Sequence, residues 1–509
     1  MVDLFGGHPD TTHLSDSDVQ FLDTTLRDGE QAPGVSLTPS EKADIARELD
    51  AAGVDVVEAG SACTGAGERE TISRVAALDL DATVTSFARG VESDVDLALD
   101  CDVDGVNLVV PASDRHVEGK VGTTRDAVVE TTVHLTEYAK AHGLWVEVLG
   151  EDGSRADLDF LERLMGEALD AGADRICYCD TVGHATPDRT LDAVSRLAAL
   201  GPTSTHTHDD LGLAVTNALV SVAAGADLVH ATVNGIGERA GNVALEEVVV
   251  ALGRGYDVET VDLERLYDLA QAVASTTGVP LAPNKAVVGE NAFTHESGIH
   301  TDGTLKDDAM YEPYPPEAVG RERRLVLGKH AGRAGVRAAL DEHGVDVTDD
   351  ELAAVVDQIK AIADRGRRVT DADLLAIADE VQGRERDRPV ELLDLTAASG
   401  GDTPTASVRL AVEGDERVAS GVGSGPVDAA VTATREALAL DATLESYHVD
   451  AITGGTDALV TVEVEVSRGD RSVTMGASDA DITRASVRAM LDAFNRLLST
   501  DEQSVAAEP

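Results

Sequence analysis

The chain has 509 residues, of which 94 are acidic and 41 basic, so its formal net charge is −53. At roughly 100–200 residues per domain, this length predicts two to four domains. Such an acidic surface argues against nucleic acid as a partner, because phosphate contacts need a basic patch. An apolar content of 43% argues against a disordered acidic chain. We interpret the net charge as a halophilic adaptation to a salt-rich cytoplasm, where ions screen the repulsion between acidic side chains.

The first 17 residues lack the basic start and apolar stretch of a signal peptide, and we expect them to form an N-terminal extension. No apolar run approaches the roughly 18 residues that a membrane span needs. We therefore expect a cytoplasmic protein with no membrane partner. The four cysteines are expected to be reduced thiols, namely Cys63, Cys101, Cys177 and Cys179.

Short apolar runs alternate with helical patterns from residue 18 to about residue 255. The expected strands are Val19–Asp23, Val54–Glu58, Ala82–Phe87, Val106–Val110, Leu144–Leu149, Arg175–Cys179, Thr203–His208 and Leu228–Thr232. The first helix has a capping box at Thr38 and Glu41 with Pro39 between them, and Gly53 ends it. Eight strand–helix repeats predict an α/β fold, a (β/α)8 TIM barrel. A doubly wound open sheet is the alternative, but no G-x-G-x-x-G follows the first strand.

The rest of the chain has a different pattern. Residues 256–384 favour helices and loops, and the strand-like runs that follow are Val390–Leu395, Thr405–Val412 and Leu459–Val466. Two helices, Val427–Leu438 and Ala480–Leu498, alternate with them. We predict a small α+β domain there. The expected division is an N-terminal extension 1–17, a barrel 18–280, a helical linker 281–384, an α+β domain 385–500 and a disordered tail 501–509.

Four polar residues follow strands that adjoin in a closed barrel. Asp28 follows the first strand, His206 and His208 end the seventh, and Asn242 follows the eighth. Alternate residues of a strand point the same way, so both imidazoles can face one point. Reactive groups of TIM barrels lie at the C-terminal ends of the strands. This pattern predicts a divalent metal site, although an isolated His-x-His pair is more often structural.

Other residues near strand ends allow two interpretations each. Arg27 is suited to a substrate carboxylate or to a structural ion pair. Glu151 and Thr181 follow the fifth and sixth strands, where a loop cap is as plausible as a site residue. His300 lies outside the barrel, where a lone histidine is usually structural.

Five motifs occur in this order: DTTLRDGEQ, HTHDDLG, NGIGERAGN, HESGIH and LGKHAGR. With them, residues 19–384 resemble the 2-isopropylmalate, homocitrate and citramalate synthase family. The final domain resembles the regulatory domain of its isopropylmalate and citramalate members, at Gly423–Ala429 and Gly455–Ala458. The resemblance implies an acyltransferase that condenses acetyl-CoA with a 2-oxo acid and uses a divalent ion (Mn, Mg or Zn).

The resemblance also implies roles for single residues. The implied metal ligands are Asp28, His206, His208 and Asn242; the implied 2-oxo acid contacts are Arg27 and Thr181; the implied catalytic pair is Glu151 and His300, with Tyr311 near the substrate. In the family the histidine and tyrosine segment reaches the partner's site, which implies a homodimer. Asp209 departs from the family's usual asparagine, and we do not assign it as a ligand.

The choice of 2-oxo acid rests on strand ends. Ser86–Arg89, Val109–Pro111, Cys179 and the Gly60-Ser61-Ala62 turn resemble citramalate synthases, which use pyruvate. The alternative is 2-oxoisovalerate, giving 2-isopropylmalate, or dual use, since methyl discrimination is worth only about 1–3 kcal/mol. Isoleucine or leucine is the expected effector, and allosteric regulation is expected in residues 385–500. A lyase on the same barrel and an inactive amino-acid sensor are the other classes. The extra domain argues against the lyase, and the intact motifs argue against the sensor.

Overall fold

The computed structural model describes residues 18–505 except 259, 365–368, 384–388, 401–402, 440–441, 452–459 and 470. These residues form two compact units, 18–293 with 313–323 and 294–312 with 324–505. The predicted N-terminal extension, the predicted boundary at residue 384 and the last four residues of the predicted tail lie outside the described residues. Within the described part, no helix has the length and apolar character required to cross a membrane.

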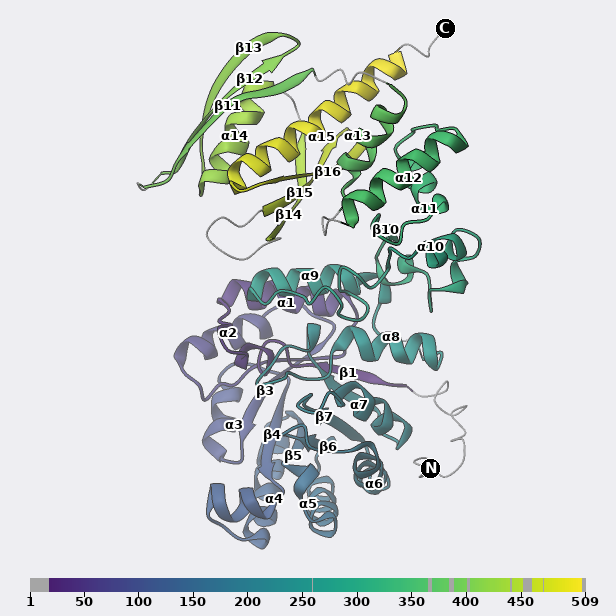
Figure 1. The fold of residues 1–509 in the computed structure, drawn as a ribbon. Coiled ribbons are helices and arrows are strands. Elements are labelled where there is room, and N and C mark those ends of the chain that lie inside the picture. Colours follow the sequence, from purple (N-terminus) through teal and green to yellow (C-terminus); the bar gives the residue numbers. More distant parts are fainter. Residues whose placement is uncertain are drawn as a thin grey trace. The chain divides into compact units, whose positions relative to one another are not determined.

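The first unit contains a closed parallel barrel of eight strands (Figure 1). The strands are β1 (Gln20–Asp23), β2 (Val56–Gly60), β3 (Thr83–Arg89), β4 (Gly105–Pro111), β5 (Trp145–Glu151), β6 (Arg175–Asp180), β7 (Thr203–Thr207) and β8 (Leu228–Ala231). Pairing of β1 with β8, from Gln20 opposite Leu228, closes the barrel. The predicted TIM barrel is confirmed, and the open sheet is excluded.

Helices surround the strands of this unit (Figure 1). They are α1 (Pro39–Ala51), α2 (Ala66–Ala76), α3 (Glu92–Leu99), α4 (Arg125–Ala141), α5 (Leu158–Asp170), α6 (Pro187–Ala198), α7 (Ala214–Ala223), α8 (Leu245–Gly255) and α9 (Leu266–Thr277). The start of α1 is the predicted one: Thr38 accepts from the backbone of Glu41, and Glu41 accepts from the backbone of Thr38. Gly53, with φ +87°, follows its end.

The apolar core of this unit lies mainly between the strands and the helices, whereas several buried residues on the strands are polar. Glu58 on β2 accepts hydrogen bonds from Thr24 and from Asn107 on β4. Glu147 on β5 pairs with His230 on β8 at 3.1 Å. These residues are fully buried or nearly so, and their hydrogen bonds compensate for the loss of water. The barrel therefore encloses polar groups directly below its C-terminal face.

The second unit combines helices with two antiparallel sheets. Its elements are β9 (Thr294–His295), α10 (Gly298–Thr304), β10 (Arg324–Leu325), α11 (Arg333–Glu342), α12 (Asp349–Ala363), α13 (Asp371–Val381), β11 (Val390–Ala398), β12 (Thr405–Val412), β13 (Asp415–Val422), α14 (Pro426–Leu438), β14 (Thr443–Ala451), β15 (Val460–Arg468), β16 (Arg471–Asp479) and α15 (Ile482–Val505). Strands β11–β13 form one sheet and β14–β16 the other. The α+β prediction is confirmed, with three strands more than the sequence indicated.

One hydrophobic core joins the helices α11–α13 to both sheets and to α14 and α15 of this unit. Val336 of α11, Leu374 of α13, Val464 of β15 and Phe494 of α15 are all buried in it. Helix α15 ends at Val505, although we expected the ordered domain to end at 500.

The turn before α14 belongs to Gly423–Ala429, the first of the two segments that resemble the family's regulatory domain. The close approach at Gly423 is to α14 itself: a Cβ on Gly423 would lie 2.5 Å from the backbone nitrogen of Ala429. Ser424 donates to Asp428 in the first turn of this helix. The second of these segments, Gly455–Ala458, lies outside the described residues. Packing against α14 therefore explains Gly423 without a ligand.

Candidate active site

Two histidines and an aspartate meet at the C-terminal end of the barrel. The Nε2 atoms of His206 and His208 are 3.3 Å apart. Oδ2 of Asp28 lies 3.6 Å from the first and 3.8 Å from the second. Asn242 joins this group through a backbone bridge to His208. The structure thus brings together the four residues expected to bind metal.

The donor set fits a divalent cation. Oδ2 of Asp28 and Oδ1 of Asn242 are buried and have no hydrogen-bond partner among the described residues. An unpaired buried polar atom costs about 1–3 kcal/mol. Ligands bound at about 2.0–2.2 Å lie roughly 3–3.5 Å from one another, close to the separations seen here. An ion held by Asp28, His206, His208 and Asn242 would remove this cost.

The electrostatics keep these ligands in their metal-binding forms. Burial raises the pKa of Asp28, but the neighbouring Arg27 guanidinium, together with His206, His208 and Asn242, outweighs it and gives a pKa of about 2. Burial lowers the pKa of His206 well below its usual value, and it also lowers the pKa of His208. An ionised carboxylate and neutral imidazoles are the species that bind divalent metals.

Arg27 is fixed beside this group by two carboxylates. Its Nη1 donates to Asp28 at 2.7 Å and its Nε to Glu58 at 2.6 Å, and its guanidinium lies over the ring of Phe87, 4.7 Å from the centroid. Arg27 therefore makes the ion pairs of a structural residue, while its Nη2 has no hydrogen bond to any described residue. A planar guanidinium fixed in this way is suited to a carboxylate ligand.

Glu151 ends β5 and lines a cavity of about 310 Å³. Phe87, Val109 and Val110 give this cavity apolar walls, and Lys120 is at its edge. Phe87, which lines the cavity, also contacts Arg27, the residue that is paired with Asp28. Glu151 is held by Lys120 at 2.5 Å and by His116 at 3.0 Å.

Thr181 connects β6 to two neighbouring loops. Its Oγ1 accepts from the backbone of Asp152, and its carbonyl accepts from Arg239. Arg239 also pairs with Asp210, two residues after His208. Asp209 accepts from the backbone of Ala214 at the start of α7, which agrees with leaving it out of the ligand set.

His300 and Tyr311 belong to the second unit. Their rings stack with centroids 4.3 Å apart. His295 lies 6.4 Å from His300 and pairs with Glu312 at 3.1 Å. The structure thus brings these two predicted residues together on α10 and the loop after it.

Sequence reasoning missed several of these contacts. His116 and Lys120 lie in a short π-helical turn and Arg239 lies on a loop, where no periodicity marks them. Glu58 carried a signal, since it is a charged residue inside an otherwise apolar strand, and a buried charge needs a partner.

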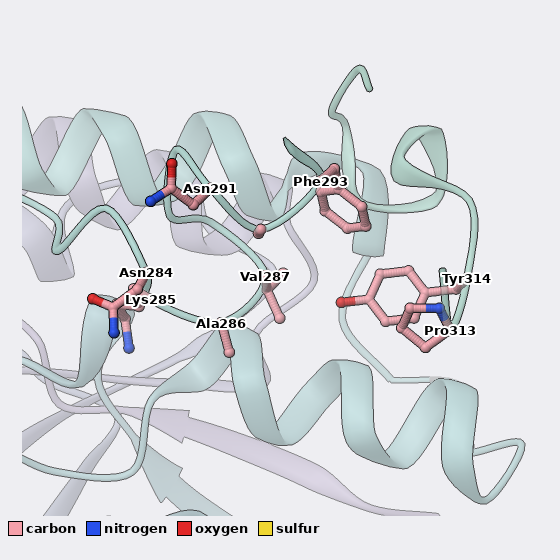
Figure 2. A pocket seen from close by; sticks show the side chains of 9 residues that line it. Asn284, Lys285, Ala286, Val287, Asn291, Phe293, Pro313 and Tyr314 are labelled. Carbon is pink, nitrogen blue, oxygen red and sulfur yellow. The ribbon is translucent and has the colours of Figure 1, made fainter. Parts of the chain in front are cut away.

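Two other features lie apart from this arrangement. A cavity of about 310 Å³ is lined by Lys285, Val287, Phe293, Tyr314 and others; Figure 2 shows Asn284 and Lys285 on one side of it and Phe293 and Tyr314 on the other. No predicted site residue lines it. The free thiol of Cys177 lies 4.0 Å from His230, whose ring is 5.5 Å from His206. All four cysteines are unpaired, as expected.

Comparison with known families places this geometry. The family model described as HMGL-like matches residues 18–273. The chain belongs to the HMGL-like family. A homocitrate synthase post-HMGL domain-like model matches residues 287–367, and a model of the LeuA allosteric (dimerisation) domain matches residues 368–498. The family resemblance derived from the motifs is confirmed.

Relatives in this family match the chain over nearly its whole length. A protein of Methanothermobacter thermautotrophicus, provisionally named (R)-citramalate synthase, is 53% identical, covering 95% of this chain and 99% of its own. Two proteins of Methanocaldococcus jannaschii follow: an (R)-citramalate synthase, 47% identical (94% and 100% covered), and a 2-isopropylmalate synthase, 45% identical (95% and 96% covered). The crystal structure of the HMG-CoA lyase from Brucella melitensis matches with a TM-score of 0.47 at 21% identity, over 52% of this chain and 99% of that one.

Proposed function

We propose that the chain is an acyltransferase that condenses acetyl-CoA with pyruvate to give (R)-citramalate and free CoA. The observation that carries the proposal is the group of Asp28, His206 and His208 beside the fixed guanidinium of Arg27. A 2-oxo acid presents a ketone and a carboxylate on adjacent carbons, and this arrangement offers a metal site and a cation for them. The names of the relatives agree with this chemistry.

Each group has a proposed task. Asp28, His206, His208 and Asn242 hold a divalent ion, with Mn, Mg and Zn as candidates. When bound, this ion supplies a Lewis acid that polarises a ketone and stabilises negative charge on its oxygen. Arg27 and Thr181 position the carboxylate of the oxo acid. Glu151, at the edge of the apolar cavity, accepts a proton from the acetyl methyl group.

Pyruvate is favoured over 2-oxoisovalerate because the strand ends Ser86–Arg89 and Val109–Pro111 resemble those of citramalate synthases, and relatives with that name are 53% and 47% identical. Isopropylmalate synthesis remains the second candidate, since a relative of that name is 45% identical. Assaying CoA release with acetyl-CoA and each oxo acid tests the proposal: we expect higher kcat/KM with pyruvate. Higher kcat/KM with 2-oxoisovalerate would assign the second function, and release of acetyl-CoA or an oxo acid from a malate would indicate a lyase.

The homodimer proposal concerns His300 and Tyr311. Because this pair lies outside the unit that holds Glu151, we propose that it completes the site of the partner subunit. An inactive Glu151→Ala protein mixed with an inactive His300→Ala protein is then expected to recover up to about a quarter of the activity after subunit exchange. This fraction follows because half of the subunits pair in mixed dimers, and each mixed dimer has one intact site. Exchange shown by mass spectrometry without recovery would contradict a shared site.

Regulation is proposed for the domain after residue 384, which resembles an allosteric domain. If the product is citramalate, we expect inhibition by isoleucine, weaker inhibition by leucine, and loss of both when the chain is cut near residue 384. The cut exposes apolar residues shared with α11–α13, so a point variant is the second arm. In Gly425→Ala the added methyl enters open space, so the fold is kept while a ligand resting on this turn is displaced. Unchanged inhibition in the truncated protein would place the effector on the barrel.

Salt dependence follows from the charge of −53. Screening shortens the range of repulsion to about 3 Å at 1 M salt, against about 10 Å at 0.1 M. We therefore expect loss of structure and activity below roughly 1 M salt. Circular dichroism and CoA release are measured across a KCl series to test this. An unchanged melting temperature in dilute buffer would contradict the proposed salt adaptation.

A further inference from the structure

The segment between β4 and α4 presents an ammonium group and an imidazole to one carboxylate. Residues Arg115–Val121 form a π-helical turn, a conformation that is rare and frequent at functional sites. From it, His116 Nδ1 lies 3.0 Å from Oε2 of Glu151, and Lys120 Nζ lies 2.5 Å from Oε1. Each carboxylate oxygen of the proposed base therefore has its own partner.

The imidazole of His116 lies between two carboxylates. Its other nitrogen, Nε2, is 3.8 Å from Oδ2 of Asp152, which is completely buried. Asp152 is fixed by Ser113 and Arg155 and has a left-handed backbone with φ 64°, unusual outside glycine. The backbone of His116 also donates to Ser113. His116 therefore lies between the partly exposed Glu151 and the buried Asp152. This is the geometry of a base that is held in place by a third group.

Lys120 and His116 differ in how far their side chains are exposed. The side chain of Lys120 is 58% exposed, whereas that of His116 is 18% exposed and its backbone donates to Ser113. A largely exposed ion pair contributes about 0–1 kcal/mol, because both side chains lose freedom and water screens the charges. Lys120 can leave Glu151 when substrate enters, but His116 stays.

We propose that His116 is a positioning residue of Glu151 that also takes over its proton. The inference rests on the proposed role of Glu151. Glu151 removes a proton from the acetyl methyl group, and the C–H electron pair stays on the enolate. That proton passes from Oε2 of Glu151 to Nδ1 of His116, and the negative charge of Asp152 stabilises the imidazolium. The imidazolium, whose side chain is 18% exposed, then loses one N–H proton to water, and Glu151 is again a carboxylate.

The test is chemical rescue in the full-length protein. For His116→Ala we expect kcat for CoA release to fall about 10–100-fold, the lower range for proton transfer by a side chain, with KM for both substrates changed less than about threefold. Adding imidazole is expected to restore kcat in a concentration-dependent way. Glu151→Gln is expected to show no rescue, and the double variant is expected to be no slower than Glu151→Gln, since the two groups act in series.

A matched control is His134→Ala on α4. His134 also pairs with a glutamate, Glu92 at 2.9 Å, but its side chain is 62% exposed. The contacts it makes, to Glu92 and Tyr138, include no site residue. We expect it to keep wild-type kcat with and without imidazole. His116→Gln, which retains the size and one hydrogen-bonding group, is the second variant if the alanine protein misfolds, as judged by its melting temperature.

The outcomes separate two failures. A folded His116 variant with wild-type kcat overturns the inference. A loss of kcat also overturns it if imidazole does not restore kcat and the double variant is slower than Glu151→Gln. Failure of the wild-type protein to release CoA with either oxo acid overturns the proposed function together with the inference.

Discussion

Replacing Asp28 or His208 by alanine is expected to lower kcat by about 10³-fold or more while the barrel stays folded. A Lewis acid at a reacting ketone supplies several kcal/mol, and each 1.36 kcal/mol is a factor of ten in rate. Asp28 and His208 each provide one of the three ligand atoms that lie within 4.8 Å of one another. Removing either leaves too few protein ligands to hold the ion in place.

The measurement combines CoA release, metal content and circular dichroism. The matched control is Asp44→Asn on α1, whose carboxylate is 73% exposed and pairs only at the surface with Arg47. We expect it to bind metal and turn over like the wild type. Near-normal turnover of both site variants, before and after chelation and metal readdition, would mean that this group is not the metal site.

Glu151→Gln is expected to lower kcat by about 10²–10⁴-fold, the usual contribution of a general base. The substitution keeps the size of the side chain and removes its ability to take a proton. The pairs with Lys120 and His116 are lost as well, but these lie at a partly exposed edge and contribute little to stability. The melting temperature should therefore change little.

Glu118→Gln provides the comparison, because Glu118 is an exposed residue of the same π-helical turn. CoA release and KM are measured for both proteins at saturating metal. A Glu151→Gln enzyme that keeps kcat within about threefold of the wild type would assign proton abstraction to another group, with His300 as the first candidate.

The barrel could be predicted because most of its strands are short apolar runs that alternate with helical patterns, and the first helix has its own start and stop signals. The metal-site residues could be predicted as a group because the C-terminal ends of parallel strands lie at one end of a barrel. Strands β13, β14 and β16 could not be predicted in the same way. Asp415–Val422 is exposed at most positions, so its sequence is polar and lacks an apolar alternation.

The immediate surroundings of Glu151 could not be predicted for a different reason. His116 is 35 positions from Glu151 in the sequence and lies in the π-helical turn after β4, and the packing of β4 beside β5 brings them together. Arg239 likewise reaches Thr181 across two loops. Spacing along the chain carries no information about such contacts, whereas the three-dimensional arrangement of strands determines them.

Asp28 follows β1, the first strand of the barrel, and Asn242 follows β8, the last. These two strands close the barrel by pairing with each other. A set of metal ligands that follow the first and the last strand comes together only after the barrel has closed. The ion therefore binds the closed barrel and not the open chain, so its binding free energy adds to the stability of the closed state by RT ln(1 + [M]/Kd). During synthesis, the chain gains affinity for the ion only when the eighth strand and the loop after it have emerged. Metal supply and completion of the fold are in this way coupled through one pair of adjoining strands.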